Sequence, residues 1–527
     1  MAEKHEETTR QAAETETETE TDINVNDSGH IQEVSRQFNL VSLAGVGLVV
    51  GNVWPAIGGS ILVAIFNGGP PGVLYEFIAV SVLYWTVAAS IAELASAIPS
   101  SAGVYHWASV TAGPGSSWGR VLGFFAGWWN YLAWVLGAAS IASILGNTIV
   151  QMYALNHADS GFVARPWHVF IVYLIATWLA CAAVCLGNKA MPRVNSFGVF
   201  AILAGFLITV IVVVAMPGRD GRPPHASSAF VWTEWTADVG YPDGFVFVAG
   251  MLNGAFSVGA VDATTHLAEE IPNPHVNVPR AIGLQMGIGF VTGLCYLIAI
   301  MYAIHDYDAL FASPYPIAEI YLQATGSVAG ATGLLALIMA CIGLTVVGLY
   351  ITCGRTLWAL ARDRATPFSA ELGHVHQSLG VPLWSTISSA ALVTVLGCIY
   401  VGSTTAFNAF VGSFILLSSS SFLAAVLPNL LTGRTNITYG PFHMRGWVGF
   451  AVNGVACGYM LAWFVIYCFP YYLPVAAADM NYASLIWGGL TVMVAMWWFL
   501  GARNGYEGPK TTGGFLPNAE TAMGRAA

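Results

Sequence analysis

Charged side chains are scarce in this sequence. Asp, Glu, Lys and Arg make up 9% of its 527 residues, whereas 56% are hydrophobic, and a soluble domain contains about 25% charged residues. The few charges are also unevenly spread, because residues 1–37 contain ten acids against three bases. The composition therefore excludes an ordinary soluble globular protein. The net charge of −10 describes an acidic N-terminal segment, which we expect to be disordered, rather than a surface for a basic partner.

Motifs of catalysis and metal binding are also lacking. The sequence has no HExxH and no Walker A pattern, and its twelve histidines are scattered along the chain. Of the eight cysteines, only Cys181 and Cys185 have the spacing of one helical face, and no histidine or carboxylate beside them completes a metal site. We therefore expect no enzymatic activity, no metal, no cofactor and no nucleic-acid partner.

Long hydrophobic runs are what the sequence has in abundance. Each is about 20 residues or longer, enough to cross a bilayer core of roughly 30 Å. They predict an all-α integral membrane domain over residues 38–503, between N-terminal and C-terminal (504–527) tails. Residues 1–37 have no apolar segment of a cleavable signal peptide, so the first span must direct the chain to the membrane. We expect twelve spans, near 40–65, 72–98, 119–150, 167–187, 194–216, 244–270, 281–304, 327–360, 383–401, 405–431, 446–468 and 482–501.

Lysine and arginine are distributed unequally between the two sides of these spans. With twelve spans and the N-terminal tail inside, fifteen of the eighteen fall on the cytoplasmic side. Only Arg165, Arg219 and Arg222 fall outside. This asymmetry is the one that the positive-inside rule expects, and it would be lost if the topology shifted by one span. The distribution therefore predicts that both termini are cytoplasmic.

Two of the spans contain residues that interrupt a helix. In the first, Pro55 removes a backbone donor and the triplet Gly58–Ser60 weakens the helix further. In the sixth, residues 253–266 combine glycines with hydroxyl groups and an acid. Interrupted backbone at membrane depth usually borders an enclosed cavity, although small residues also allow close helix packing. Breaks five spans apart favour a cavity between two inverted five-helix repeats, near 38–216 and 244–431, with 446–501 as extra spans.

The breaks carry features that suit a small amine or amino acid. Helix N-termini at a break attract a carboxylate, whereas carbonyl ends attract an ammonium group. Trp54 and Phe256 adjoin the two breaks, and aromatic faces bind ammonium groups with about 0.5–2 kcal/mol each. The sequence by itself leaves open whether the solute is a quaternary ammonium or a zwitterion.

Few ionisable groups lie near or within the spans, and such groups usually have a function. Asp262, His266 and one of the two following glutamates recur at helical spacing, which predicts one face able to relay protons. The alternative for these glutamates is an ion pair with Arg280 or Arg355 at the helix end. Glu93, near the inner end of the second span, is expected to pair with another residue of a gate rather than to bind the substrate. The candidates for proton coupling or gating are Glu93, Asp262, His266 and Glu270, with Glu269 beside them.

Three motifs resemble those of a known superfamily. They are Glu93-Leu-Ala-Ser-Ala-Ile-Pro99-Ser-Ser-Ala-Gly103-Val-Tyr105, then Ala263-Thr-Thr-His266-Leu-Ala-Glu-Glu270-Ile-Pro272-Asn-Pro274 leading to Val278-Pro279-Arg280, and Ala361-Arg362-Asp363 running to Pro367 with Val381-Pro382. Together they resemble the amino acid–polyamine–organocation superfamily. The chain is more closely similar to the fungal amino acid/choline permeases, which include GABA and choline carriers. The resemblance covers residues 38–503.

The resemblance implies a LeuT-like fold that holds its substrate between discontinuous spans one and six. It also implies uptake across the plasma membrane, driven by protons. Two departures are the Gly58-Gly59-Ser60 order, where many relatives read Gly-Ser-Gly, and the absence of a glycine after Ala361-Arg362-Asp363. By position, the implied substrate-binding residues are Ile57, Gly58, Gly59 and Ser60 in span one, and Phe256, Ser257, Val258, Gly259 and Ala260 in span six.

The expected function is proton symport of choline, GABA or a related amino acid, by alternating access. An amino-acid exchanger on the same fold is the alternative, because it would need no proton site. An integral-membrane enzyme or a permease-like sensor is more remote, since the sequence has no clustered catalytic residues and a short C-terminal tail. The expected partners are the solute, protons and the lipid bilayer.

Overall fold

The computed structural model describes residues 36–219, 221–403, 405–476, 480–506 and 508–509. The predicted tails, 1–37 and 504–527, therefore lie almost entirely outside the described residues. The described chain consists of helices joined by turns: α2 (Leu40–Val50), α3 (Val53–Gly59), η1 (Ile61–Val63), α4 (Gly69–Ala97), α5 (Val104–Thr111), α6 (Ser117–Asn156), η2 (Ala158–Ser160), α7 (Pro166–Gly187), η3 (Asn188–Ala190), α8 (Met191–Ala215), α9 (Ser228–Trp232), α10 (Asp243–Val258), η4 (Thr265–Glu270), α11 (Pro274–Tyr302), α12 (Tyr307–Ala312), α13 (Pro316–Thr325), α14 (Val328–Arg362), α15 (Ser369–Leu372), α16 (Leu383–Gly402), α17 (Ala406–Leu431), α18 (Trp447–Ile466), α19 (Ala483–Trp497), η5 (Trp498–Ala502) and α20 (Arg503–Gly505).

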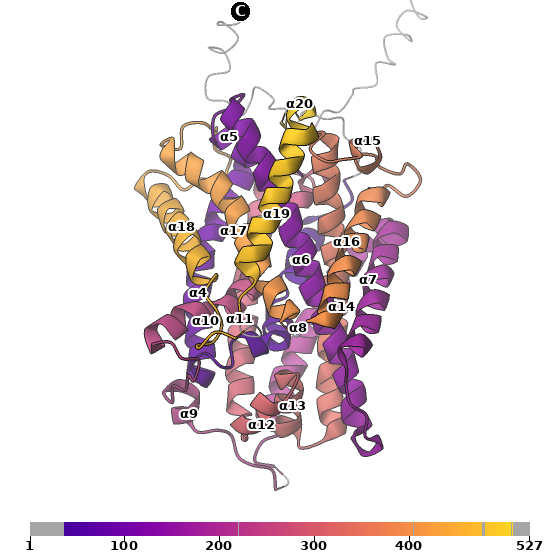
Figure 1. Ribbon diagram of the computed structural model, residues 1–527, viewed down its shortest axis with the longest axis vertical. Helices are drawn as coiled ribbons and strands as arrows, with labels where there is room; N and C mark the ends of the chain where they lie inside the picture. Colours follow the sequence, from indigo (N-terminus) through magenta and orange to yellow (C-terminus); the bar gives the residue numbers. More distant parts are fainter. Residues whose placement is uncertain (1–35, 220, 404, 477–479, 507, 510–527) are drawn as a thin grey trace, which may run out of the picture.

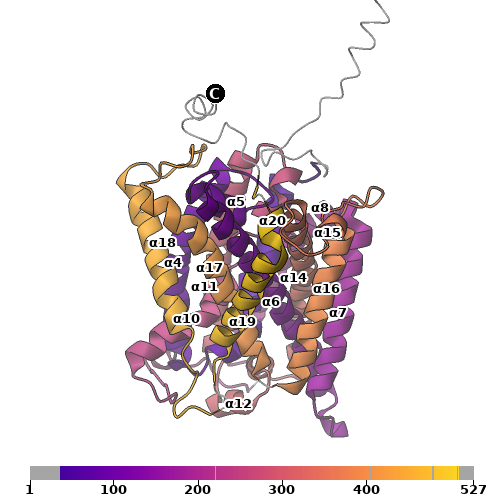
Figure 2. The ribbon, with the colours of Figure 1, turned by 45° about the horizontal axis from the view of Figure 1, so that its top comes forward.

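The helices form a single bundle around α6. The 40-residue α6 packs along α14 and α17, while α4 packs between α10, α11 and α18. Helices α7 and α16 lie together on one side and α18 on the other (Figures 1 and 2). The short helices α5 and α15 mark one end of the bundle, and α9 and α12 mark the other. We call these ends the α5/α15 face and the α9/α12 face.

The outer helices present large apolar side chains to their surroundings. Leu186 of α7, Leu485 of α19 and Leu500 of η5 are 76%, 69% and 82% exposed. Contiguous exposed apolar surface on this scale is unfavourable in water and is the normal outer surface of a membrane protein. The all-α membrane class is therefore confirmed.

Ten helices of the described chain are long and apolar enough to span a membrane. One of the ten, Pro166–Ala215, is 50 residues long and would extend about 75 Å if it were continuous. The short η3 divides it into α7 and α8, and both halves pack against α14. Helix α10, with 16 residues, is shorter than these ten but is also apolar and packs inside the bundle. The predicted total of twelve differs from ten by these two elements and stays a prediction.

The first span is interrupted earlier than expected. Helix α2 ends at Val50 and α3 begins at Val53, whereas Gly58 and Gly59 form the last turn of α3. The α-helix thus breaks at Gly51–Asn52, which was not predicted, and ends again at the predicted Gly58–Ser60 triplet, before the short η1. Proline clashes with the carbonyl four residues before it, and for Pro55 that residue is Gly51, at the observed break. Because Pro55 lies in the first turn of α3, its missing donor costs the helix nothing.

The sixth span ends as a helix at Val258. Residues 259–260 are irregular, 261–264 form turns, and 265–270 form the 3₁₀ helix η4. The helical spacing used to group Asp262, His266 and the glutamates was therefore wrong as a description of this segment. The Asp262–His266 contact nevertheless forms, because the turn folds the two side chains together.

Candidate functional site

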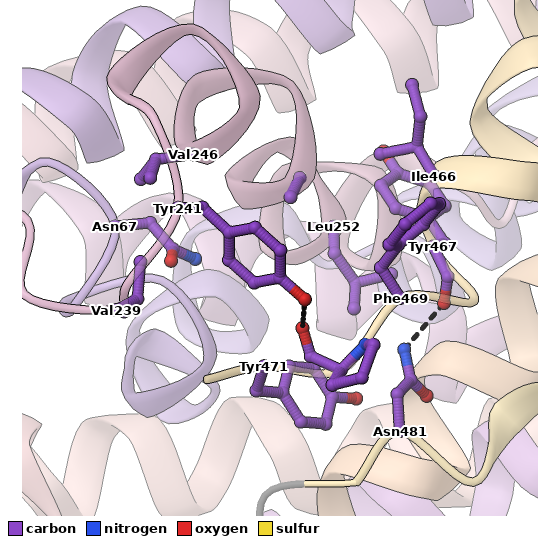
Figure 3. Close-up of a pocket in the computed structure, with 12 residues that line it drawn as sticks. Asn67, Val239, Tyr241, Val246, Leu252, Ile466, Tyr467, Phe469, Tyr471 and Asn481 are labelled. Carbon is purple, nitrogen blue, oxygen red and sulfur yellow. Dashed lines mark hydrogen bonds between the residues drawn. The ribbon is translucent and has the colours of Figure 1, made fainter. Parts of the chain in front are cut away.

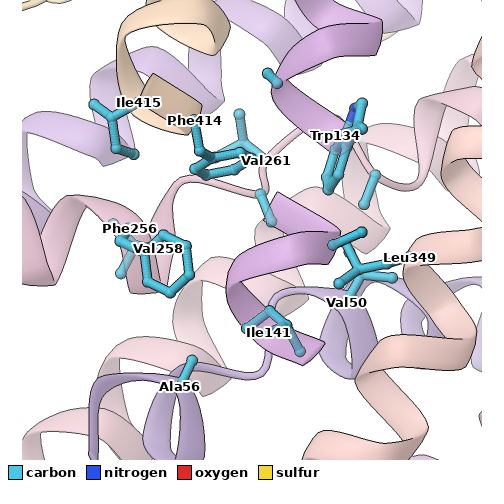
Figure 4. Close-up of a cluster of buried hydrophobic side chains, with 14 of the residues drawn as sticks. Val50, Ala56, Trp134, Ile141, Phe256, Val258, Val261, Leu349, Phe414 and Ile415 are labelled. Carbon is cyan, nitrogen blue, oxygen red and sulfur yellow. The ribbon is translucent and has the colours of Figure 1, made fainter. Parts of the chain in front are cut away.

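A small cavity lies where the two interrupted spans meet α6, α14 and α17. Its aromatic wall consists of Trp134 on α6, Phe256 on α10 and Phe414 on α17, which Figure 4 shows around one space. The ring of Phe414 lies 6.0 Å from that of Trp134 and 5.7 Å from that of Phe256, both edge-on. Edge-on packing leaves ring faces available to a cation. Three aromatic rings therefore border one cavity, whose volume of about 20 Å³ holds a water-sized group in this closed arrangement.

Polar atoms without partners also border this cavity. The Asn52 amide nitrogen donates to Thr345 Oγ1 at 3.2 Å, whereas Asn52 Oδ1 has no hydrogen-bond partner among the described residues. The indole Nε1 of Trp134 is likewise buried without a partner in that part of the chain. Buried polar groups are normally hydrogen-bonded, and an exception calls for an explanation. A bound polar solute would supply the missing acceptor for Trp134 and the missing donor for Asn52.

The structure separates the predicted substrate residues into two groups. Phe256, Ser257 and Ala260 line the cavity, beside Asn52 and Ala56 of the first span. The others are buried but do not line it: Trp54, Ile57, Gly58, Gly59, Ser60, Val258 and Gly259. Their direct contact with a substrate stays a prediction.

The residues of α3 that do not line the cavity have structural partners. Trp54 points toward α8, where its Nε1 donates to the Ile202 carbonyl oxygen at 3.2 Å. A Cβ at Gly58 would overlap the hydroxyl of Tyr296. Ser60 donates to the side chain of Asn253, and this bond joins the end of α3 to α10.

Gly59 borders a second cavity, which lies toward the α9/α12 end of α6 and α7. Ile144, Asn147 and Tyr315 line it together with Gly59. The Tyr315 hydroxyl bonds to Thr148 Oγ1 at 2.8 Å, and burial raises the pKa of this phenol. Tyr315 therefore remains a neutral hydrogen-bonding group next to Gly59.

Asp262 and His266 form a buried pair beside the aromatic wall. His266 Nε2 lies 3.2 Å from Asp262 Oδ2, and His266 Nδ1 lies 3.3 Å from the Ser101 carbonyl oxygen. A carbonyl oxygen can only accept, so the Ser101 contact is a hydrogen bond when Nδ1 carries a hydrogen, and the Asp262 contact is one when Nε2 or the carboxyl group does. Both contacts are hydrogen bonds at the same time only when the pair holds one proton more than a carboxylate beside a neutral imidazole.

This pair is connected to its surroundings on both sides. Asn130 Nδ2 donates to Asp262 Oδ2 at 2.7 Å, and the His266 ring lies 6.2 Å from that of Trp134, edge-on. Trp134 thus contacts the Asp262–His266 pair on one side and lines the cavity on the other. A change of charge on the pair would alter the electrostatic potential in the cavity.

Two ion pairs close the α5/α15 side of the bundle. Glu270 pairs with Arg355, one of the two arginines named as its alternative partners in the sequence. Arg355 Nη2 also donates to Asn188 Oδ1 at 3.2 Å. Glu269 pairs with Arg362 through two bonds of 3.1 and 3.0 Å; the sequence had suggested Arg280 or Arg355. Bidentate arginine–carboxylate pairs are strong and directional. They bind η4 firmly to the end of α14.

Glu93 makes a third buried pair, with Arg434. Its Oε1 also accepts from the Met444 amide at 2.7 Å. Arg434 lies in the segment between α17 and α18, so this pair fastens that segment to the end of α4. Glu93 and Glu270 thus each lie against an arginine, whereas the partner of Asp262 is His266.

The sequence-based interpretation missed several residues of this site. Asn52 precedes the expected break, and Phe414 lies in an apolar run without any distinguishing signal. Trp134 lies in the aromatic-rich third span, and the neighbouring Trp128, Trp129 and Tyr131 do not line the cavity. The expectation that the sequence contains no G-x-S-x-G pattern was wrong, because Gly115–Gly119 is one. It lies at the start of α6, where Ser116 caps the helix, and the described residues before it contain no strand, which a hydrolase elbow would require.

Residues 38–490 match the family model described as amino acid permease. The chain belongs to this family, which confirms the resemblance drawn from its motifs and identifies a multi-pass membrane protein of a transporter family. Among its relatives, a choline transporter of Saccharomyces cerevisiae is 32% identical over 471 residues, 88% of this chain and 81% of the relative.

Two further relatives are more distant. A putative amino acid/polyamine transporter of Macrophomina phaseolina is 28% identical over 449 residues, which cover 84% of this chain and 97% of that protein. The transmembrane transporter swnT of Metarhizium robertsii is 28% identical over 486 residues, 91% of this chain and 94% of the relative.

Proposed function

We propose that this protein takes up a small amine solute by proton symport, with choline as the first candidate and GABA or a related amino acid as the second. Transport proceeds by alternating access in a LeuT-like arrangement of two inverted repeats, near 38–216 and 244–431. The protein acts in the plasma membrane with both termini cytoplasmic. The α5/α15 face is then the cytoplasmic face.

The aromatic wall is the observation that carries this proposal. Trp134, Phe256 and Phe414 surround one small cavity, and a quaternary ammonium is recognised chiefly by aromatic faces. Asp262, in contact with His266 next to Trp134, adds negative charge close by when it is ionised. A positively charged headgroup therefore fits better than a carboxylate, for which the cavity lining offers no cationic side chain. The similarity to a choline transporter supports the same order of candidates.

Proton coupling is supported by the Asp262–His266 pair. The pair needs one additional proton to satisfy its hydrogen bonds, and it lies next to the cavity wall. Loss of that proton would break one of these two hydrogen bonds. Proton binding and solute binding can therefore influence one another through Trp134.

Uptake of labelled solutes tests the substrate. The protein is expressed in a host that lacks its own transporters, and choline, GABA and a neutral amino acid are compared at equal concentration. We expect saturable choline uptake, with GABA slower. Uptake of the neutral amino acid alone would replace the amine assignment with an ordinary amino-acid carrier.

An imposed pH gradient separates symport from exchange. In vesicles without internal solute, an acidic exterior should drive uptake by the symporter, whereas an exchanger would take up nothing until solute is loaded inside. His266→Gln should abolish the response to the gradient and leave solute exchange measurable. A response that survives in both His266→Gln and Asp262→Asn would remove this pair from the coupling mechanism.

A further inference from the structure

Glu76 is a buried carboxyl group that the proposed mechanism does not use. It lies in α4, two turns from the helix start, and is 2% exposed. Neither of its carboxyl oxygens has a hydrogen-bond partner among the described residues. This sets it apart from Glu93 on the same helix, which pairs with Arg434.

The surroundings of Glu76 offer no compensating cation. Within their bounds α4, α9, α10 and α18 contain no lysine or arginine, and the one in α11, Arg280, lies toward the opposite end of α4, where Ser96 bonds to His275. The titratable groups on the packed elements are Tyr75, Tyr84 and Glu93 of α4, Asp243 of α10, His275, Arg280, Cys295, Tyr296 and Tyr302 of α11, and Cys457, Tyr459 and Tyr467 in or just after α18. Apart from His275 and Arg280, at the opposite end of α4, all of these are neutral or acidic. Tyr467 is the one whose phenol is within electrostatic reach of Glu76.

A charged carboxylate in this position would be costly. Desolvating an ion costs several kcal/mol even after relaxation, and the cost is recovered only by a well-placed partner. A protonated carboxyl avoids most of this cost. The packing around Glu76 is therefore compatible with its neutral form and unfavourable for its ionised form.

Glu76 is also an integral part of the contact between α4 and α10. Helix α10 contains the pair Gly250 and Gly254, a GxxxG spacing that allows close helix approach. A Cβ at Gly250 would overlap the Glu76 carboxyl group, and one at Gly254 would overlap Val80. The carboxyl group thus occupies the space that the missing side chain of Gly250 leaves.

Helix α10 connects this contact to the substrate cavity. One turn beyond Gly250, Asn253 bonds to Ser60 at the end of α3, and Phe256 forms part of the aromatic wall. On its other side, α10 borders a pocket toward the α9/α12 face that Tyr467, Tyr241 and Asn481 also line (Figure 3). Tyr467 links this polar pocket electrostatically to Glu76.

We propose that Glu76 is a second proton-binding site of this transporter, neutral while α10 packs on α4 and ionised when α10 moves away and admits water from the Tyr467 pocket. Release of the proton favours the separated arrangement, because a carboxylate cannot remain against Gly250. Glu76 thereby acts as a positioning residue for α10. Its role in coupling rests on the proposed symport, whereas its neutrality in the packed arrangement does not.

Infrared difference spectra test the protonation state without any substrate. Spectra of the purified full-length protein at neutral pH are subtracted from those of Glu76→Gln, and Glu234→Gln, an exposed loop acid, is the matched control. We expect the difference to contain the carbonyl band of a protonated carboxylic acid, absent from the Glu234 control. Carboxylate bands in its place would overturn the proposal. Glu76→Met serves the same purpose if the amide variant is poorly produced.

Transport by Glu76→Gln tests the coupling role. A gradient of one pH unit drives accumulation of up to about tenfold for one proton per solute, because each unit is worth about 1.4 kcal/mol. We expect the variant, which cannot release a proton here, to exchange choline across loaded vesicles but to lose this accumulation, while Glu76→Asp retains part of it. Full accumulation by Glu76→Gln would overturn the coupling role. If the wild-type protein transports none of the probes, the proposed function fails, and the infrared result still decides whether Glu76 is neutral.

Discussion

The ring of Phe414 lies between the other two aromatic rings of the cavity, so it is the position where the chemistry of the wall can be tested most directly. Phe414→Leu keeps an apolar side chain and removes the ring face. Because one cation–π contact contributes about 0.5–2 kcal/mol, we expect the KM for choline to rise about twofold to thirtyfold. Uptake kinetics give the KM, and Trp447→Leu, on a 79% exposed ring, is the matched control. An unchanged KM in Phe414→Leu would place the ammonium group elsewhere.

Gly59 provides a steric test at the residue scale. A Cβ at this position would already overlap the side chain of Ile144, and Gly59 borders the cavity on the α9/α12 side. We expect Gly59→Leu to abolish solute uptake while the protein still reaches the membrane, as fluorescence of a tagged chain can show. Normal uptake by this variant would contradict the assignment of Gly59 to the solute path.

Arg364 stands at the position, directly after Ala361-Arg362-Asp363, where the third motif usually has a glycine. This exposed residue follows α14 with φ of 60°, a left-handed conformation that costs a residue with a side chain about 1–2 kcal/mol. We expect Arg364→Gly to stabilise the protein by about 1 kcal/mol, measured by thermal unfolding in detergent. Arg364→Ala keeps the Cβ and should give no comparable gain, so an equal gain in both variants would rule out the backbone explanation.

At the site, the sequence predicted chemistry better than it predicted contacts. Residues such as Asp262 and His266 could be identified because ionisable groups are rare in spans. Phe414 could not, since one phenylalanine in an apolar helix is indistinguishable from the next until α17 is packed against α10. Glu76 was overlooked among the intramembrane acids for a different reason. Its importance lies in the absence of a partner, which only the packed structure reveals.

At the scale of elements, the lengths of the hydrophobic runs predicted the positions of the helices well and the positions of their interruptions poorly. The membrane helices could be predicted because long runs of apolar residues are stable only in a lipid bilayer. The first break in this span depends on the backbone bond that Pro55 disrupts, and that bond lies upstream, at Gly51, whereas the second helix end follows Gly58 and Gly59. The end of α10 depends on turns whose side chains, Asp262 and His266, find partners on other elements.

The Glu93–Arg434 pair shows how a single contact can hold an element in place. Glu93→Gln would leave the Arg434 guanidinium, which is 7% exposed, without its carboxylate. Removing one partner of a buried pair typically costs about 3–5 kcal/mol, so we expect markedly less folded protein and a lower unfolding temperature.

The matched control for this prediction is the double variant Glu93→Gln, Arg434→Met. It removes the uncompensated charge, and replacement of a buried pair by apolar or neutral groups is often close to neutral in stability. We expect the double variant to be more stable than Glu93→Gln alone. A double variant that is no better would show that Glu93 acts through the Met444 amide rather than through the ion pair.

At the scale of the whole molecule, the ion pairs and the cavities are segregated. The pairs of Glu269, Glu270 and Glu93 gather toward the α5/α15 face, whereas the cavities beside Gly59 and Tyr467 lie toward the α9/α12 face. Alternating access requires each side to close in turn. Under the proposed alternating access, the arrangement described here is the one in which the α5/α15 side is closed.

The Glu270–Arg355 pair is the most direct test of that closure. Arg355→Gln removes the charge that holds η4 on α14, so we expect the α5/α15 side to open more often and solute uptake to fall. Cys353, buried two residues earlier on α14, should react faster with a water-soluble thiol reagent added from that side. Exchanging the charges in Glu270→Arg, Arg355→Glu should restore slow reaction and part of the uptake, because a pair of opposite charges forms again across the same gap. If Cys353 reacts equally slowly in wild-type and Arg355→Gln protein, the pair supports the fold without acting as a gate.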